Sequence, residues 1–394
     1  MTSVNRLVIA HNFPPYSDAS AVTLAKRIAE RGEVVDVIAK DFQDKRPYDP
    51  PLQNLTAPFL GWVYYAPGPV SWAKWGSFRD FTTKGLHAVD IRRAGSPYPE
   101  VYSRSMWAQS HILAAALIAT GRAKYWEAEF SDPLLWTVEH TFRPSEKVPA
   151  DALAKRLLAS VAPRVGQLLR KRRTVFEWAQ LLPFALADRL VFTNEQQLTT
   201  MLQDAPEWMR ESVRERSVVS PHPSPPAEWV PEAPPKEPSR SSATLGFFGS
   251  FYINRGLGNL LEAWASLPND QARRLSLHVH TANDFSRAVA TATRLGLHHQ
   301  VKQRPLLSYV DFLTECQRLD ALLVTDTSSQ GFPVINPFLP SKYSDYRATR
   351  TPILALTTPG SPLSQVEDIR WNVAMHDIDA VRSALMDIAN EVRE

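Results

Sequence analysis

Residues suited to binding a phosphate and a sugar gather between Leu339 and Ala348. Pro340 is typical of a helix start, which places Ser341 and Lys342 on the first turn of the predicted helix. The backbone N–H groups of such a turn have no partner within the helix and can bind an anion. Asp345 can accept hydrogen bonds from hydroxyl groups. The segment therefore predicts a site for a ligand with both an anionic group and hydroxyls.

A second candidate phosphate site lies between Leu245 and Gly258. Gly249 and Ser250 follow an apolar run, and Arg255 stands before two further glycines. Glycines let the backbone come close to a phosphate, and Arg255 would supply a charge beside it. No G-x-G-x-x-G motif and no Walker-type lysine accompanies this run, so the pattern alone does not establish a phosphate site.

Five polar residues of the first half are further candidates. Ser17 and Asp18 follow the first predicted strand, where ligands of open α/β sheets bind, although the alternative is that they only cap the next helix. His111 lies on a predicted apolar helix and Arg104 on the strand before it, and packing in the core is the alternative for both. Asp132 precedes a proline and could instead cap a turn.

The elements that position these residues alternate between short apolar runs and helix-length amphipathic segments, which is typical of a parallel sheet covered by helices. The fold class is therefore α/β. The predicted strands of the first half are Leu7–Ala10, Val34–Ala39, Val101–Ser105, Tyr125–Phe130 and Leu190–Thr193, with helices at Ala19–Arg31 and Ser110–Thr120. Those of the second half are Thr244–Gly249, Leu275–His280, Val301–Arg304, Ala321–Thr325, Ile353–Thr357 and Val373–His376. Each set could form one doubly wound sheet.

The length predicts two domains, because a single core rarely grows past about 250–300 residues. The proline-rich, aperiodic segment 221–242 is the predicted linker between an N-terminal domain, 1–220, and a C-terminal domain, 243–394. The last helix of the second domain could pack back on the first. The segment Lys40–Gly76 is irregular, and it is either a long loop or a poorly periodic part of the first core.

Composition excludes several classes of protein. With 44 Lys and Arg against 41 Asp and Glu, the net charge of +3 is too near neutral for a dedicated nucleic-acid binder. Cys316 is the only cysteine, which rules out an intramolecular disulfide and fits a reducing compartment. No signal peptide and no apolar stretch of ~18 residues is visible, so we expect a cytoplasmic protein. His278 and His280 lack a third ligand nearby and no Asp-x-Asp pair occurs, so we expect no metal and no other cofactor.

The segment 155–184 combines basic residues with an apolar stripe and ends in aromatic residues. This composition suits an interfacial helix on anionic lipid, which would make the protein peripheral at the inner face of a membrane. The alternative is a surface helix whose apolar stripe faces the core. The basic residues are Lys155, Arg156, Arg164, Arg170, Lys171, Arg172 and Arg173, and the aromatic residues are Phe176, Trp178 and Phe184.

Several segments together resemble the GT-B glycosyltransferases of the large retaining family four, also called glycosyl transferases group 1. PSKYSDYRATRTPILAL is similar to the signature P-x-K-x-x-E-Y-x-A-x-G-x-P followed by apolar residues. LGFFGSFYINRGLGNLLEAW resembles the glycine-rich strand, turn and helix of that family, and HNFPPYSDASAVTLAKRIAERG resembles its N-terminal loop and helix. The resemblance covers nearly the whole chain. It implies two Rossmann-like domains that face each other across a cleft.

The resemblance also implies roles for individual residues. Asp345 stands where the family has a glutamate that binds the donor ribose, and Arg255 where it has a basic residue on the diphosphate. His111 lies about where the family has a histidine near the reacting sugar, and Asp132 where it has an aspartate on the acceptor side. Ser17, Asp18 and Arg104 are further residues expected on the acceptor or cleft side, and Gly249, Ser250, Ser341 and Lys342 on the donor side.

Four positions depart from the family pattern. Pro337 replaces the first of two family glutamates, Ser250 replaces a common arginine, Arg350 replaces a common glycine, and Ser17-Asp18 replaces a glycine pair. We expect a hexosyltransferase-type enzyme that moves a sugar from a nucleoside diphosphate sugar to a glycan or lipid-linked acceptor, with retention and without a metal, in surface glycan or glycoconjugate synthesis. The missing glutamate leaves open a non-catalytic binding subunit, and the fold leaves open a nucleotide-sugar epimerase.

Overall fold

The computed structural model describes residues 4–43, 45–234, 242–251, 256–282, 284–328 and 336–391. The chain divides into two compact units, Met1–Pro223 and Ser224–Glu394, and each has its own sheet and its own core. The first three residues of the predicted linker, 221–223, therefore belong to the first unit.

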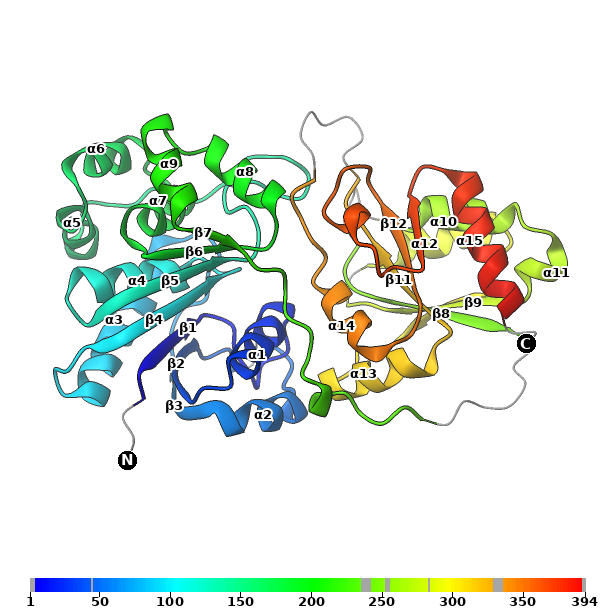
Figure 1. Ribbon diagram of the computed structural model, residues 1–394, viewed down its shortest axis with the longest axis horizontal. Helices are drawn as coiled ribbons and strands as arrows, with labels where there is room; N and C mark the ends of the chain where they lie inside the picture. Colours follow the sequence, from blue (N-terminus) through cyan, green and yellow to red (C-terminus); the bar gives the residue numbers. More distant parts are fainter. Residues whose placement is uncertain are drawn as a thin grey trace. The chain divides into compact units, whose positions relative to one another are not determined.

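The first unit is built on a parallel sheet, which has seven strands in the described residues (Figure 1). Its strands in spatial order are β3 (Leu60–Ala66), β2 (Val35–Lys40), β1 (Arg6–Ala10), β4 (Tyr98–Ser105), β5 (Ala123–Phe130), β6 (Arg189–Phe192) and β7 (Ser217–Val219). The strand order reverses between β1 and β4, and this is where an open α/β sheet leaves a crevice beyond the carboxyl ends of its strands.

Alternating side chains of β1 divide the first core into two layers. Leu7 and Ile9 pack with α3, α4 and α7 on one face of the sheet, whereas Val8 packs with α1 on the other. Helix α4 is buried on all sides, which fits its uniformly apolar sequence. The helices of this unit are α1 (Ala19–Arg31), α2 (Pro50–Thr56), η1 (Ala57–Phe59), α3 (Trp75–Arg93), α4 (Gln109–Ala119), α5 (Ala152–Ala159), α6 (Pro163–Lys171), α7 (Val175–Leu186), α8 (Glu195–Gln203) and α9 (Glu207–Glu215).

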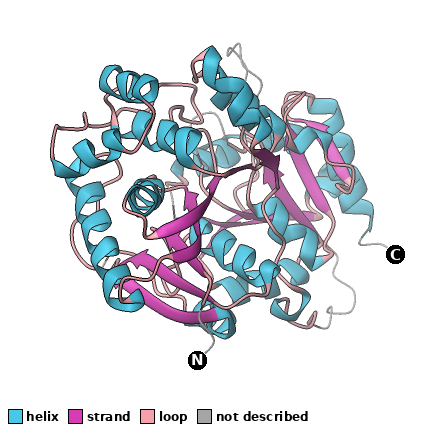
Figure 2. Ribbon diagram, turned by 60° about the vertical axis from the view of Figure 1, so that its left-hand side comes forward, coloured by secondary structure: helices cyan, strands magenta, loops and turns pink. Residues whose placement is uncertain are grey.

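The second unit repeats this plan with a parallel sheet of six strands in its described part (Figure 2). The spatial order is β10 (Val301–Arg304), β9 (Leu275–His280), β8 (Ala243–Phe248), β11 (Ala321–Thr325), β12 (Ile353–Thr357) and β13 (Trp371–Ala374). Its helices are η2 (Ala227–Trp229), α10 (Gly258–Ala265), α11 (Asn269–Ala272), α12 (Ser286–Arg294), α13 (Tyr309–Arg318), α14 (Lys342–Thr349), η3 (Leu363–Gln365) and α15 (Ile378–Glu391). The last helix, α15, shares the second core with α10.

For two segments the structure distinguishes between the alternatives that the sequence leaves open. The irregular segment 40–76 is a poorly periodic part of the first core: it holds α2, η1 and the edge strand β3, whose half-buried side chains give little periodic signal. The basic segment 155–184 forms three helices instead of one interfacial helix. Its aromatic residues lie on α7 and are core residues, Phe176 at 0%, Trp178 at 3% and Phe184 at 1% exposed, so they are not available to a membrane.

Candidate functional site

Buried polar side chains with incomplete hydrogen bonding gather at the carboxyl edge of the first sheet, around the start of α4. Each has at least one buried nitrogen or oxygen atom that makes no hydrogen bond to the described residues. These residues, called the edge cluster below, are His11 and Asn12 after β1, Ser105 at the end of β4, Ser131 after β5, and Gln109 and His111 in the first turn of α4. Buried polar atoms are normally paired with protein or water. The edge cluster therefore has hydrogen-bonding capacity that the described residues leave unused.

An aromatic wall surrounds His11. Its ring stacks on Trp107 at 4.8 Å and 9°, and Phe81 and Phe42 lie at 5.1 and 5.4 Å between ring centroids. Burial, helped by the nearby charge of Lys40, lowers the pKa of His11 well below its usual value. His11 is therefore neutral at physiological pH and offers hydrogen bonds without a charge.

His111 is the only one of the sequence-predicted catalytic residues that the structure describes, and it belongs to the edge cluster. Its Nδ1 lies 2.8 Å from Ser103 Oγ, and its ring contacts Phe130 edge-on at 4.8 Å. Burial lowers the pKa of His111 to about 3. The side chain is fully buried, as expected if His111 is a packed core residue. Its Nε2 nevertheless makes no hydrogen bond to the described residues.

Arg104 is not brought together with His111, because neighbouring residues of β4 point to opposite faces of the sheet. Arg104 Nε donates to Glu129 at 2.9 Å and its Nη1 donates to Ser20 Oγ at 3.0 Å. Tyr102 also donates to Glu129, at 2.7 Å. Arg104 thus lies in a buried ion-pair network on the face that α1 covers.

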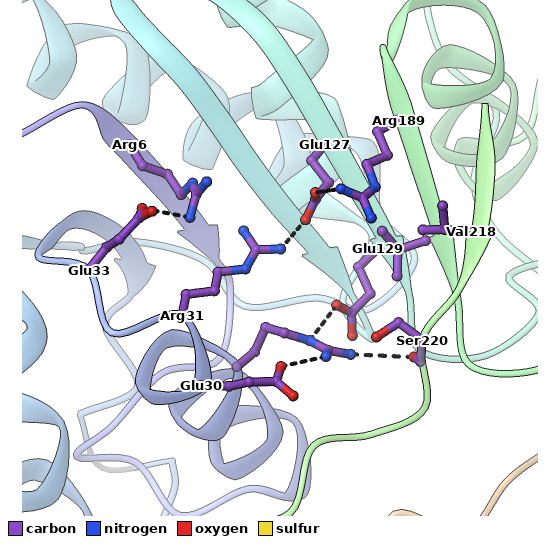
Figure 3. A pocket seen from close by; sticks show the side chains of 11 residues that line it. Arg6, Glu30, Arg31, Glu33, Glu127, Glu129, Arg189, Val218 and Ser220 are labelled. Atoms are coloured by element: carbon purple, nitrogen blue, oxygen red, sulfur yellow. Dashed lines mark hydrogen bonds and ion pairs between the residues drawn. The ribbon is translucent and has the colours of Figure 1, made fainter. Parts of the chain in front are cut away.

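This network borders a pocket of about 330 Å³ on the same face (Figure 3). Arg27 donates to Glu129 and to Glu30, and its Nη2 also donates to the carbonyl oxygens of Ser220 and Pro221. Figure 3 shows arginines and glutamates paired with one another across the pocket. The positive and negative charges of the pocket lining therefore balance one another. Through Arg27, the network also links the backbone of the last residues of the first unit to α1 and β5 by hydrogen bonds.

Ser17, Asp18 and Asp132 follow strands β1 and β5 at the same edge of the sheet. Asp18 accepts a hydrogen bond from Ser20 N as the N-cap of α1 and forms an ion pair with Arg46. Ser17 uses its backbone N–H to bind Pro47 O. Asp132 is half-buried. The carboxylate of Asp18 has structural partners, so an acceptor role for it stays a prediction, as it does for Ser17 and Asp132.

In the second unit, α14 and α13 bring a carboxylate, a lysine and a tyrosine together. Asp345 is buried, and Tyr309 donates its hydroxyl hydrogen to Asp345 Oδ1 at 3.0 Å. Lys342 Nζ lies 4.0 Å from Asp345 Oδ2 and 4.2 Å from the centre of the Phe312 ring. Ser341 holds the N-cap position of α14, makes no side-chain capping hydrogen bond, and is half-buried. Asp345, Lys342 and Ser341 are therefore grouped as the sequence predicts.

The segment before α14 is fixed to the end of β11. Asn336 Nδ2 donates to Asp326 Oδ1 at 2.7 Å, and Thr358 N donates to Asp326 Oδ2 at 3.2 Å. Both Asn336 and Asp326 are buried. Pro337, which stands where the family has its first glutamate, therefore follows an asparagine that has a structural task. Gly249 and Ser250 are half-buried directly after β8, whereas Arg255 lies outside the described residues.

No family model and no curated protein matches the sequence, but solved structures do match the chain. Anabaena HepE in complex with UDP and glucose has a TM-score of 0.59 at 13% identity, over 99% of this chain and 94% of that chain. Sucrose-phosphate synthase from Thermosynechococcus elongatus has a TM-score of 0.61 at 14% identity, over 99% and 91%. The lipopolysaccharide outer core galactosyltransferase WaaB has a TM-score of 0.56 at 12% identity, over 98% and 90%. This chain has the GT-B fold.

Within the GT-B fold, both candidate sites lie at the carboxyl edges of the parallel sheets. Six residues of these two groups are not predicted from the sequence: His11, Asn12, Ser105, Gln109 and Ser131 in the first unit, and Tyr309 in the second. His11 and Asn12 could have been selected, because they follow directly after a predicted strand. Tyr309 could not, since it is 36 positions from Asp345 and only the packing of α13 on α14 brings them together.

The described part of this GT-B chain contains no group of three or more His, Cys, Asp or Glu side chains arranged to hold a metal ion. His280 donates from Nδ1 to Pro305 O, 2.7 Å away, and its ring stacks on Phe248 at 4.5 Å. His278 lies 3.2 Å from Arg304 through Nε2. Within the same residues, no helix is long and apolar enough to cross a membrane.

Proposed function

We propose that this chain transfers a glycosyl group from a nucleoside diphosphate sugar to an acceptor hydroxyl. The observation that carries the proposal is the edge cluster, whose buried hydrogen-bonding groups are uncharged and stand beside the aromatic side chains around His11. A ligand with several hydroxyls and an apolar ring face suits such a lining better than a phosphate does. The sugar is therefore assigned to the first unit.

The nucleotide is assigned to the second unit. Lys342 supplies a positive charge for a diphosphate, and Asp345 supplies a carboxylate for ribose hydroxyls. Solved structures of the same fold contain UDP, both Anabaena HepE, in complex with UDP and glucose, and S. aureus MnaA. UDP-sugars are therefore the first donors to test.

The reaction proceeds with retention and without a divalent metal in this proposal, as the family resemblance implies. Charge that develops on the leaving diphosphate is stabilised by Lys342, by Arg255 and by the N–H groups at the start of α14. The acceptor is a glycan or a lipid-linked sugar, in surface glycan or glycoconjugate synthesis.

Ligand-dependent stabilisation tests the proposal. A nucleotide sugar that binds the folded protein at a hundredfold excess over its Kd should add about 2.7 kcal/mol of stability. Scanning fluorimetry with UDP, GDP and ADP and their sugars should therefore show a raised melting temperature with one base. A flat melting temperature with all of them at millimolar concentration contradicts the proposal. Release of a free, epimerised sugar nucleotide without acceptor would instead identify an epimerase.

A further inference from the structure

The outer strand of the first sheet, β3, exposes backbone groups that pair with no other strand. In the described residues the sheet ends at β3 on one side, with β2 as its neighbour. Successive residues of a strand turn their N–H and C=O groups to alternate sides, so about half of these groups point away from β2. Among the described residues, no backbone group from Gly61 to Tyr65 bonds to an element other than β2. This edge is therefore able to pair with a further strand.

The other three sheet edges carry features that keep strands from pairing. β7 has three residues and is followed by Pro221 and Pro223, β10 has four residues that include Lys302 and Arg304, and β13 has four. Short length, charge and proline are the usual protections of an edge strand. β3 has the sequence LGWVYYA, which is seven residues long and contains neither a charge nor a proline. It is the edge that lacks these three protections.

A bulge at Gly61 limits the regular part of β3. The register against β2 shifts between Val35 and Asp36, which leaves Gly61 as the extra residue of β3. A bulge disrupts a strand ladder locally. The residues Trp62–Ala66 remain in one unbroken register with β2, and Tyr64 is the midpoint of this segment.

Two strongly exposed apolar side chains lie beside the same edge. Ile91 is 70% exposed and Val34 is 51% exposed. Ile91 precedes Arg92 in the last turn of α3, and the Arg92 guanidinium lies 5.7 Å from the centre of the Trp62 ring. Val34 Cγ1 lies 3.4 Å from the position that a Cβ on Gly61 would take. Exposed apolar side chains next to unpaired strand groups are typical of a protein contact.

A second copy of the chain fits this edge. Two identical strands can pair antiparallel about a two-fold axis, and two-fold dimers are the commonest oligomers. With Tyr64 on the axis, its ring faces the same ring of the second copy, and Val63 faces Tyr65 of the second copy. Pairs of aromatic residues, and of aromatic with β-branched residues, stabilise a sheet. Because β3 has no charged residue, this pairing places no like charges of the two strands opposite each other.

We propose that the chain forms a two-fold dimer in which the segments Trp62–Ala66 of two copies pair antiparallel. The pairing joins the two first sheets into one continuous sheet, and Val34 and Ile91 become buried on either side of it. The inference does not depend on the proposed function, because none of these residues belongs to the edge cluster or to the group around Asp345.

Analytical ultracentrifugation of the full chain at micromolar concentrations tests the proposal. We expect a dimer. Tyr64→Lys should be monomeric, since it places two like charges opposite each other on the axis. The double variant Val34→Lys, Ile91→Lys should raise the dimer Kd by at least about tenfold, because apolar area of both copies is no longer buried. Both of its sites are exposed, so this variant decides the matter if Tyr64→Lys does not fold. A monomeric wild type, or a dimer that persists in the folded variants, overturns the proposal.

A matched control places the same substitutions on the second unit. Val289 and Leu306 are also exposed apolar residues, and the double variant Val289→Lys, Leu306→Lys should leave the dimer Kd unchanged. An equal loss of dimer in this control overturns the assignment of the contact to β3.

Cross-linking tests the two-fold register. The one native cysteine, Cys316, is buried, so Tyr64→Cys adds the reactive thiol. A short bismaleimide should link two copies of Tyr64→Cys, because position 64 faces itself across the axis. It should link Leu306→Cys much less. Equal linking of the two variants contradicts antiparallel pairing centred on Tyr64.

Discussion

At the scale of single residues, Glu129 is the buried carboxylate at the centre of the ion-pair network on the α1 face of the first sheet. It is 1% exposed and accepts hydrogen bonds from Arg27, Arg104 and Tyr102. Burial would raise its pKa, but the two arginines and the hydrogen bonds lower it to about 2. A buried pair of this kind does not guarantee extra stability over an apolar packing, but removing one partner leaves the others uncompensated.

Glu129→Gln should lower the free energy of unfolding by about 3–5 kcal/mol at pH 7, since the buried Arg104 then loses its counter-charge and Arg27 keeps only the exposed Glu30. Urea unfolding measures the loss. Glu30→Gln is the matched control, because Glu30 is an exposed partner of the same Arg27, and it should change stability by less than about 0.5 kcal/mol. Equal losses for both variants would show that burial of the network is not what matters.

The stability of the first unit should also fall in acid through Glu129. Its folded pKa, about 2, lies below the ordinary value of 4.5, so its contribution is complete above pH 4.5 and disappears as the pH falls towards 2. The loss amounts to about 3 kcal/mol. Unfolding curves between pH 6 and pH 3 should show this slope in the wild type and a shallower one in Glu129→Gln; parallel slopes would refute the assignment.

In the second unit, variants of Asp345 and Tyr309 distinguish a role of Asp345 in donor binding from a purely structural role. Asp345→Ala should raise the donor KM by an amount worth about 1–3 kcal/mol, because the lost hydrogen bonds are to a charged group. Tyr309→Phe is the control, since it removes one hydrogen-bond partner of Asp345 and leaves the carboxylate in place. Steady-state kinetics with varied donor measures both. A folded Asp345→Ala with the donor KM of wild type would remove Asp345 from the donor site.

At the scale of elements, the C-terminus of α14 shows why one departure from the family pattern matters. Arg350, in place of a common glycine, has φ 60° and ψ 3°, the left-handed conformation that usually ends a helix with glycine. A side chain in this conformation costs about 1–2 kcal/mol. Helix α14 still ends at Thr349, with Arg350 at the C-cap in the left-handed conformation.

Arg350→Gly should therefore raise the melting temperature, with a gain in stability of about 1 kcal/mol. Arg347→Gly is the control: it lies within the same helix, is also exposed, and should lose about 1 kcal/mol because glycine is a poor helix former. Thermal unfolding of the two variants should shift in opposite directions. A destabilised Arg350→Gly would mean that the arginine side chain makes contacts that outweigh its backbone strain.

The sequence predicts the elements well where burial is periodic and poorly where it is not. The strands from Leu7, Leu275 and Ala321 begin at or next to their predicted residues because both faces of a parallel strand are apolar. β3 is missed because edge strands are half-exposed. The sequence does not predict α5, α6 and α7 as three separate helices, because the pattern of apolar residues continues across the short connections between them. The grouping of Ser341, Lys342 and Asp345 follows from local spacing, whereas the contact of Tyr309 needs the packing of α13 on α14 and the edge cluster depends on three strands that only the sheet order places together.

At the scale of the whole molecule, the charge on α5 and α6 is the remaining feature of the basic segment. Lys155, Arg156, Arg164, Arg170, Lys171 and Arg173 are exposed, whereas Arg172 donates to Asp204 O. With the aromatic residues buried, any attraction to a membrane has to be electrostatic, worth about 1 kcal/mol per charge near an anionic surface.

Reversal of Arg170, Lys171 and Arg173 to Glu should abolish flotation with liposomes that contain anionic lipid and leave the melting temperature nearly unchanged. The control is the same charge change at exposed positions of the second unit, Arg287, Lys302 and Arg382. Because salt screens surface charges, flotation of the wild type should also weaken with ionic strength. Flotation that survives both the reversal and high salt contradicts a role for this surface.

Release of nucleoside diphosphate in the presence of excess EDTA tests most directly whether the protein is the metal-independent glycosyltransferase that we propose. The donors are UDP-, GDP- and ADP-sugars, supplied with glycan and lipid-linked acceptors, and product NMR reads the anomeric configuration. We predict acceptor-dependent release from one donor, with retention at the anomeric carbon. This release should be unchanged by EDTA and strongly reduced in Asp345→Ala at low donor concentration. Release that EDTA abolishes and Mn²⁺ restores, or inversion at the anomeric carbon, would contradict the mechanism. No release from any donor would contradict the function.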